Sequence, residues 1–288
     1  MAPRFDLQSH SRHSDGALEA GAVVRAAAEE GIELLALSDH DTVDGVDEAL
    51  AVAGEVGVAL VPAAELSAVH GDHQDLHILG YRLDHHDGEL LDALADFRAD
   101  RERRADRMAQ RLGELGFAVD DELLDERRRS GKPIGRPHLA QAVISDVNNE
   151  VRLEREGIDE FGDFIAAYLV PGKEGFLPRT RPTVAEAIAV IHAAGGVAVW
   201  AHPFWDVSAP EEVVATIDAF RADGLDGVEA FYATHTREQT ELLAGACSER
   251  GLLSTGSADF HGPDHKHFAH FGAFELYGLE PDLGPIAG

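Results

Sequence analysis

The stretch Ile32-Glu33-Leu34-Leu35-Ala36-Leu37-Ser38-Asp39-His40-Asp41-Thr42 predicts the fold of this 288-residue chain. Five of its first six residues are aliphatic, and apolar and polar positions do not alternate, which is typical of a parallel strand buried on both faces. Ionisable side chains follow at once, at Asp39, His40 and Asp41. Because α/β enzymes place their chemistry at the carboxyl ends of such strands, we expect this strand to deliver polar residues to an active site.

Strands and helices alternate on both sides of this stretch. We expect strands over residues 5–7, 32–37, 58–62, 76–81, 197–200, 227–231, 252–255 and 272–276. Helical patterns separate most of them, over residues 18–30, 43–55, 183–194, 211–223 and 237–250. This alternation predicts βαβ units and a parallel sheet. The expected fold class is therefore α/β, a distorted (β/α)7 barrel.

The alternation stops between residues 84 and 180, where the pattern is helical and no strand is expected. Helices are predicted over residues 89–115, 120–130, 137–145 and 159–169. We therefore expect a barrel formed by residues 1–83 and 181–288, with an inserted helical subdomain at 84–180 that forms a lid or holds substrate. The first of these helices carries a row of arginines with interleaved acidic residues, which favours a solvated face over a nucleic-acid patch.

Composition narrows the class of partner and the compartment. The formal net charge is -29, from 53 acidic and 24 basic residues, which disfavours an extended nucleic-acid surface and favours divalent cations. The single cysteine, Cys247, excludes an internal disulfide and fits a reducing compartment. No apolar run approaches the roughly 18 residues of a membrane span, and no signal core follows Met1. We expect a cytoplasmic protein without a membrane partner. The oligomeric state is not predicted.

Eight ionisable side chains lie in or just after the predicted strands, and a barrel would bring them to one rim: His10, Asp15, His40, Glu65, His77, His202, Asp259 and His261. Singly, each has an ordinary explanation as a turn, a cap, a surface charge or a core histidine. Together, they would leave like charges and unpaired donors in a poorly solvated space unless cations were present. Imidazole and carboxylate ligands suit Mn, Fe or Zn better than Ca. Since a carboxylate such as Glu65 can bridge, we expect two or three divalent metal ions, with Mn favoured, and hydrolysis of a phosphate ester by a metal-bound hydroxide.

The chain resembles the PHP (polymerase and histidinol phosphatase) family of metal-dependent phosphoesterases. The matching segments are residues 6–11, 14–16 and 38–42, Glu65, and residues 76–81, 201–203 and 259–262. The resemblance implies a distorted seven-stranded barrel with three metal ions. They would be held, in turn, by His10, Glu65 and Asp259; by Glu65, His77 and His202; and by Asp15, His40 and His261. We take Glu65, His202 and Asp259 as the catalytic residues.

One position departs from the family pattern. The first motif is usually Asp-Leu-His-x-His, and Gln8 replaces its first histidine here. An amide oxygen is a weaker and harder ligand than imidazole, so the first metal site should be looser or differently selective. Gln8 could still coordinate, or hold a water molecule. His13 is expected to face solvent or to lie behind the ligands.

Substrate-binding residues are predicted in the insertion and after one strand. Residues 134–139, Ile-Gly-Arg-Pro-His-Leu, resemble a segment of the small PHP proteins that act on nucleotides, in which the Arg and His hold a substrate phosphate. A guanidinium binds phosphate through two parallel hydrogen bonds, and a helix N-terminus adds positive dipole. We therefore expect Arg136 and His138 to bind phosphate, although a plain Gly-Arg-Pro loop is the simpler alternative. His235 is a further candidate by its place after a strand.

The first hypothesis is a small PHP-type phosphoesterase that acts on a nucleotide. By resemblance, its substrate would be a 3',5'-bisphosphate such as adenosine bisphosphate, or the 5' end of short RNA. The alternatives are a histidinol-phosphate phosphatase, which the helical insertion disfavours, and a proofreading module, which would accompany a polymerase. An alternative of another class, suggested by Gln8, is a metal-binding regulatory protein that has lost its activity.

Overall fold

The computed structural model describes residues 4–129 and 134–288, and the chain divides into two compact units. The first unit consists of Met1–Ala95 and Arg181–Gly288, and the second of Asp96–Thr180.

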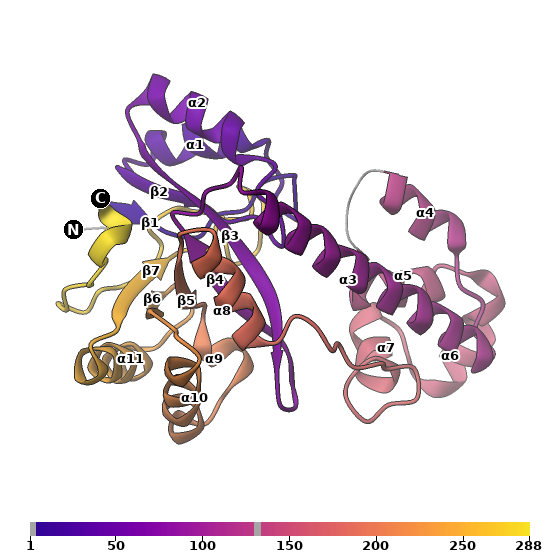
Figure 1. Cartoon of the computed structure of the whole chain (residues 1–288). Helices are drawn as coiled ribbons and strands as arrows, with labels where there is room; N and C mark the ends of the chain where they lie inside the picture. Colours follow the sequence, from indigo (N-terminus) through magenta and orange to yellow (C-terminus); the bar gives the residue numbers. More distant parts are fainter. Residues whose placement is uncertain (1–3, 130–133) are drawn as a thin grey trace. The chain divides into compact units, whose positions relative to one another are not determined.

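Seven strands form one sheet in the first unit (Figure 1). They are β1 (Phe5–Asp6), β2 (Leu34–Leu37), β3 (Ala59–His70), β4 (His73–Tyr81), β5 (Val197–Trp200), β6 (Gly227–Tyr232) and β7 (Leu253–Ser257). Neighbours in the sequence are neighbours in the sheet. The first and last strands also meet, because Leu7 N donates to Gly256 O at 3.2 Å and Ser9 bridges Phe260 in parallel. The sheet is thus a nearly closed barrel, which confirms the predicted fold class.

The orientation of the fourth strand corrects the prediction of an all-parallel sheet. β4 runs antiparallel to both β3 and β5. β3 is longer than predicted and continues to His70, so that only Gly71 and Asp72 separate it from β4. A parallel pair needs a crossover of a dozen or more residues, whereas two residues close a hairpin. Glu65 consequently lies within β3 and not at its end.

The predicted strand over residues 272–276 is wrong. The structure describes these residues, and they form no strand. Gly272 N donates to the side-chain carboxylate of Asp6, in β1, at 2.8 Å, and not to the backbone of a strand. Phe274 is buried and packs edge-on against Phe5, with ring centroids 5.5 Å apart. Side-chain contacts therefore hold this segment across the barrel wall.

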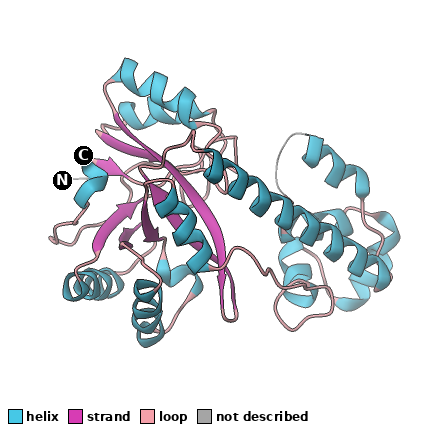
Figure 2. Ribbon diagram, in the orientation of Figure 1, coloured by secondary structure: helices cyan, strands magenta, loops and turns pink. Residues whose placement is uncertain are grey.

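Helices cover the outside of the sheet in this unit (Figure 2). They are α1 (Ala20–Glu29), α2 (Val46–Val56), α8 (Val184–Ala193), α9 (Pro203–Asp206), α10 (Pro210–Ala222), α11 (Arg237–Arg250) and the 3-10 helix η2 (Gly284–Ala287). One apolar cluster joins α1 and α2 to β2 and includes Val24, Leu35 and Leu37. A second cluster includes Leu7, Tyr81, Val199 and, from η2, Ile286. Burial of these apolar side chains fixes the strands that carry the site.

The second unit is helical and has its own core. Its helices are α3 (Gly88–Glu114, which begins in the first unit), α4 (Asp121–Arg129), α5 (Arg136–Ile144), η1 (Val147–Asn149), α6 (Glu150–Glu156) and α7 (Phe161–Tyr168). Met108, Leu112, Leu139 and Phe164 are among its buried residues. The short helix α6 was not predicted.

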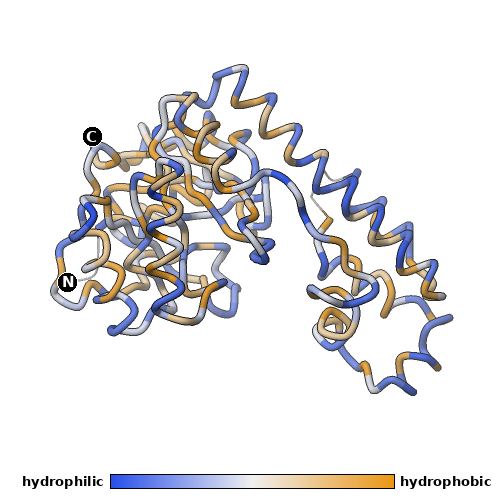
Figure 3. The backbone as a smooth tube through the Cα atoms, turned by 60° about the horizontal axis from the view of Figure 1, so that its bottom comes forward, coloured by the Kyte–Doolittle hydropathy of each residue, from blue (hydrophilic) through white to orange (hydrophobic). Residues whose placement is uncertain are grey.

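Much of α3 is hydrophilic (Figure 3). Arg103 makes the local contact expected of a solvated face, a bond to Asp100 at 3.2 Å. Arg104 differs, because it is buried and bonds to Leu177 O, far along the chain, at 2.7 Å. Among the residues that the structure describes, no helix has the length and apolar character needed to cross a membrane.

Candidate metal centre

Strand ends and strand interiors in the first unit bring the eight predicted side chains together. His10 and Asp15 follow β1, His40 follows β2, and His202 comes two residues after the end of β5. Glu65 lies in β3 and His77 in β4, while Asp259 and His261 follow β7. Their ligand atoms form three overlapping groups, described in turn below.

The Glu65 carboxylate is the centre of the arrangement and is fully buried. Its Oε1 lies 2.8 Å from His77 Nδ1 and 3.1 Å from His202 Nε2. Its Oε2 lies 3.1 Å from His10 Nε2 and 3.5 Å from His40 Nδ1. Each oxygen thus faces a different pair of imidazoles, which is the geometry of a carboxylate that can bridge two cations.

A second group consists of His10, Glu65 and Asp259, all buried. His10 Nε2 is 3.1 Å from Glu65 Oε2 and 3.1 Å from Asp259 Oδ1. One nitrogen and two carboxylate oxygens therefore converge on a single point.

The third group lies at the more open side of the site, around Asp15. Asp15 Oδ2 is 3.6 Å from His40 Nε2, and its Oδ1 is 3.5 Å from His261 Nε2. His10 Nδ1 approaches the same carboxylate at 3.7 Å. The Asp15 side chain is 45% exposed, so this group is the one that solvent reaches most easily. His13, two residues before, is exposed, as expected.

The residues present fit divalent cations. Several buried ligand atoms have no hydrogen-bond partner within the described part of the chain: His10 Nε2, His40 Nδ1, Glu65 Oε2 and Asp259 Oδ1. A buried polar atom left unsatisfied costs about 1–3 kcal/mol. Because these atoms lie 3.1–3.5 Å from one another, cations between them would satisfy several at once.

The electrostatics of the site favour the metal-binding forms of Glu65 and His40, but not that of His10. Burial would raise the pKa of Glu65, but His40 and His77 outweigh it and hold that pKa well below the ordinary value. Burial lowers the pKa of His40 to about 4. Burial would also lower the pKa of His10, but the neighbouring Asp259 and Glu65 carboxylates raise it well above the ordinary value. Carboxylates and neutral imidazoles are the ligand forms, so metal binding would displace the His10 proton.

Two ligands stand on strained backbone. His202 has φ of 29° and Asp259 has φ of 57°, both in the left-handed region. Such conformations cost on the order of 1–3 kcal/mol for a residue with a Cβ and concentrate at functional sites. His202 N donates to Glu229 Oε2 at 2.9 Å, which helps to hold that residue in place.

Three supporting residues were missed from the sequence. Asp39 accepts from Ser11 N, Ser11 Oγ and Ser14 Oγ at 2.6–2.7 Å, which fixes the loop that carries Asp15. Tyr232 donates its hydroxyl to Asp259 Oδ2 at 2.8 Å. Glu229 is fully buried in β6. A signal existed for Glu229, because it interrupts an otherwise apolar predicted strand, and for Asp39, because it precedes His40.

Gln8 is also fully buried. Its Oε1 accepts from Ser257 Oγ at 3.3 Å, while its Nε2 has no partner among the described residues. Ser257 Oγ in turn lies 2.5 Å from Glu229 Oε1. Gln8 is thus connected to the buried residue that holds His202.

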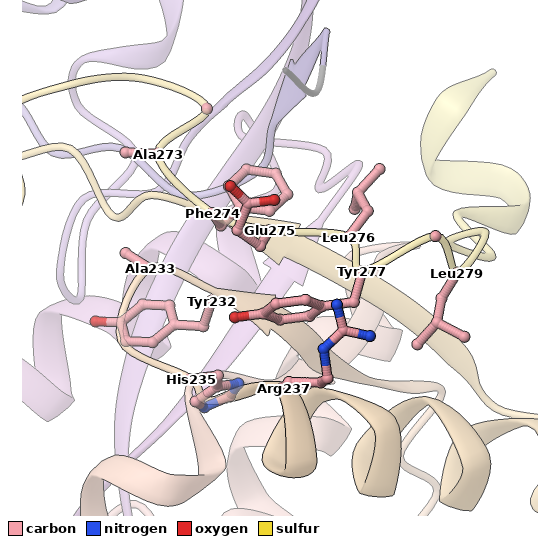
Figure 4. A pocket seen from close by; sticks show the side chains of 12 residues that line it. Tyr232, Ala233, His235, Arg237, Ala273, Phe274, Glu275, Leu276, Tyr277 and Leu279 are labelled. Carbon is pink, nitrogen blue, oxygen red and sulfur yellow. The ribbon is translucent and has the colours of Figure 1, made fainter. Parts of the chain in front are cut away.

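His235 lies at a pocket of about 900 Å³ whose lining also includes Tyr232, Arg237 and Tyr277 (Figure 4). The Arg237 guanidinium lies 4.7 Å from the centre of the Tyr277 ring. The His235 ring is buried, and its Nδ1 bonds to Ala230 O at 3.2 Å. Burial lowers the pKa of His235 to about 4. The ring is therefore neutral, with its proton on Nδ1, and Nε2 offers a lone pair, which does not favour binding of a phosphate oxygen.

Arg136 and His138 belong to the second unit, at the start of α5. Gly135 precedes the helix, and its N–H donates to His138 Nδ1 at 2.9 Å. In the neutral ring the proton therefore lies on Nε2, which makes that atom a donor. Both side chains are partly exposed.

Comparison with known proteins places this geometry in a family. The PHP domain family model matches residues 6–127. A 5'-3' exoribonuclease from Haemophilus influenzae is 32% identical, with 91% of this chain and 92% of the relative covered. A 3',5'-nucleoside bisphosphate phosphatase from Chromobacterium violaceum is 30% identical, with 90% and 87% covered. A crystal structure from Bifidobacterium adolescentis, described as a candidate metal-dependent phosphoesterase, has a TM-score of 0.72 at 31% identity and covers 93% of this chain and 91% of its own.

Proposed function

Because this chain belongs to the PHP domain family and is a metal-dependent phosphoric ester hydrolase, we propose that it removes phosphate from a nucleotide. Two substrates are favoured: a 3',5'-bisphosphate such as adenosine bisphosphate, and the 5' end of short RNA. The relatives from Chromobacterium violaceum and Haemophilus influenzae carry names that correspond to these two activities. Histidinol phosphate finds no support among the relatives named above.

The Glu65 carboxylate is the observation that carries this proposal. It faces four imidazoles with its two oxygens, at 2.8–3.5 Å. We assign three divalent ions to the three groups: His10, Glu65 and Asp259; Glu65, His77 and His202; and Asp15, His40 and His261. Mixed nitrogen and oxygen ligands suit Mn²⁺, with Fe or Zn as the alternatives.

Divalent ions bound in this way would supply a nucleophile at neutral pH and stabilise negative charge on the phosphate. The protein's own residues have positioning roles. Glu65, whose pKa is held low, stays a carboxylate and can bridge two ions. The Tyr232 hydroxyl donates a hydrogen bond to Asp259 Oδ2, and the other carboxylate oxygen, Oδ1, faces His10 Nε2. Glu229 holds the backbone of His202, whose Nε2 faces Glu65.

We assign substrate phosphate binding to Arg136 and His138. Arg136 offers a planar set of N–H donors that matches phosphate, and Pro137 follows it in the first turn of α5. The Nε2–H of His138 adds a second donor, because its Nδ1 accepts from Gly135. For His235, whose Nε2 carries no proton, we propose a place in the wall of the pocket and not a phosphate contact.

A panel of phosphate esters tests the proposal. The purified full-length protein would be assayed with added Mn²⁺ on adenosine 3',5'-bisphosphate, on short 5'-phosphorylated RNA and on histidinol phosphate. Turnover of either of the first two is expected. Turnover of histidinol phosphate alone would overturn the substrate class, and bound metal without any turnover would support a regulatory protein.

The Arg136→Ala variant tests the phosphate contact in the same assay. We expect KM for the favoured substrate to rise about tenfold or more, since a guanidinium–phosphate contact contributes about 1.5–3 kcal/mol. Arg155→Ala, which removes an exposed arginine of α6, is the matched control. An unchanged KM in Arg136→Ala would remove Arg136 from the site.

A further inference from the structure

The Gln8 side chain has an unbalanced hydrogen-bond arrangement. One end of its buried amide meets Ser257 Oγ at 3.3 Å, and the other end, Nε2, has no partner in the described part of the chain. An unsatisfied buried N–H₂ is costly, and it would be more costly beside cations, which repel it. The carbonyl end in the same place would be attracted to a cation.

Ser257 can accept the other end of the amide. Its single hydroxyl proton lies toward Glu229 Oε1, at 2.5 Å, which is the shorter of its two contacts. With that proton directed to Glu229, the oxygen of Ser257 keeps lone pairs for an N–H donor. If the Gln8 amide is rotated by half a turn, its Nε2 takes the place of Oε1 and donates to Ser257 Oγ, which in turn donates to Glu229. The Gln8 carbonyl oxygen then takes the place of the unsatisfied Nε2.

Gln8 belongs to one of the two segments that supply the group of His10, Glu65 and Asp259. Phe260 N donates to Gln8 O, and His10 N donates to Phe260 O, so that the segments before His10 and after Asp259 are paired. Gln8 lies two residues before His10, and Ser257 lies two residues before Asp259. The contact between the Gln8 and Ser257 side chains therefore joins the two segments that carry His10 and Asp259, two of the three ligands of this group.

We propose that Gln8 supplies its carbonyl oxygen as a fourth ligand to the ion held by His10, Glu65 and Asp259, with Ser257 and Glu229 fixing the amide. This inference rests on the proposed function only in assuming that metal binds there. Three oxygens and one nitrogen make this a harder site than one with two imidazoles. Harder donor sets favour Mn²⁺ or Mg²⁺ over Zn²⁺. The Glu229–Ser257–Gln8 chain thus sets the metal preference of one site.

Metal titration of the full-length protein tests the proposal without any assay of turnover. Mn²⁺ binding would be followed by electron paramagnetic resonance of the free ion, in wild type, Gln8→Ala, Gln8→His and Ser257→Ala. In Gln8→Ala, the Mn²⁺ affinity of one site should fall by about 10–100-fold. Gln8→His should restore binding, shift that site toward Zn²⁺, and add a ¹⁴N coupling to the bound Mn²⁺ signal. Ser257→Ala should weaken the same site, to a smaller extent.

Gln141→Ala, at an exposed glutamine of α5, is the matched control and should bind as wild type does. Circular dichroism would show whether each variant is folded. If Gln8→Ala does not fold, the Zn²⁺ preference and the ¹⁴N coupling of Gln8→His still test the proposal. Equal Mn²⁺ affinity in wild type and Gln8→Ala, or a Gln8→His protein with neither a Zn²⁺ shift nor a new coupling, would overturn the inference. A protein that binds metal as predicted but hydrolyses none of the substrates would contradict the proposed function alone.

Discussion

His40 and Glu65 are joined by their backbones as well as by their side chains. Asp41 N donates to Glu65 O at 2.9 Å, and Glu65 N donates to Asp39 O at 3.2 Å, so the parallel pairing of β2 with β3 resumes beyond Leu37. His40 Nδ1 lies 3.5 Å from Glu65 Oε2. The sheet register therefore sets the position of these two ligands before any metal binds, and a rigid scaffold of this kind reduces the cost of assembling the site.

Glu65→Gln should abolish turnover while the fold stays intact. The amide removes a negative charge from the centre of four imidazoles and cannot bridge two cations with two equivalent oxygens. Loss of a residue that only supports a metal ligand costs up to about 100-fold in activity. Because Glu65 would be a ligand itself, we expect kcat to fall by at least about 100-fold. Steady-state kinetics with Mn²⁺ and metal analysis would measure the change. Glu211→Gln, at an exposed position of α10, is the control, and a near-normal rate in Glu65→Gln would refute the bridging role.

Tyr232→Phe should weaken metal binding without unfolding the protein. The variant removes the hydroxyl that donates to Asp259 Oδ2 at 2.8 Å and keeps the buried ring. Loss of a hydrogen bond to a ligating carboxylate typically costs 10–100-fold in metal affinity or activity. A Mn²⁺ titration should show a loss of about tenfold. Tyr277→Phe, at a second tyrosine that lines the pocket and contacts Arg237, should bind Mn²⁺ as wild type does.

Sequence patterns were sufficient to predict the eight clustered side chains, because six of them follow strands and the other two, Glu65 and His77, lie within neighbouring strands. Polar residues at the ends of neighbouring strands converge in any barrel, whatever the details of packing. The antiparallel β4 left this convergence intact. His77 lies in the middle of that strand, and its side chain still reaches Glu65.

The residues that support the ligands depend on packing and were harder to predict. The contact between Tyr232, at the end of β6, and Asp259, after β7, joins residues 27 positions apart, and no spacing rule specifies it. Glu229 gave a signal as a charge in an apolar strand, but its partners, His202 N and Ser257, follow only from the folded barrel. The hairpin that reverses β4 was missed because β3 extends past Glu65 as far as His70.

Removal of metal should lower the thermal stability of the protein. Without cations, Glu65, Asp259 and Asp15 rely on protonated histidines for compensation, and several ligand atoms stay unsatisfied. Binding to the folded state alone contributes about 2.7 kcal/mol when the ligand is at 100 times its dissociation constant. The melting temperature should therefore fall in EDTA and recover with Mn²⁺. The same additions should shift Glu65→Gln much less, and an equal shift would place the stabilising ions outside this centre.

Asp6 should make the metal-free protein less stable as the pH rises from about 4 to about 7. Burial raises the pKa of its carboxyl to about 7, against backbone hydrogen bonds from Gly272 and Ala258 that lower it. A carboxyl with a raised pKa in the folded state contributes its stabilisation fully below the unfolded value of about 4, and that contribution is lost as the pH rises to the folded value. The loss of stability is at most about 1.4 kcal/mol per pH unit and ends above pH 7.

Urea unfolding in EDTA at several pH values would measure this loss of stability, with Asp6→Asn as the comparison. Because the amide does not titrate, the free energy of unfolding of Asp6→Asn relative to wild type should increase steadily between pH 5 and 7, and a difference that does not change with pH would contradict the raised pKa.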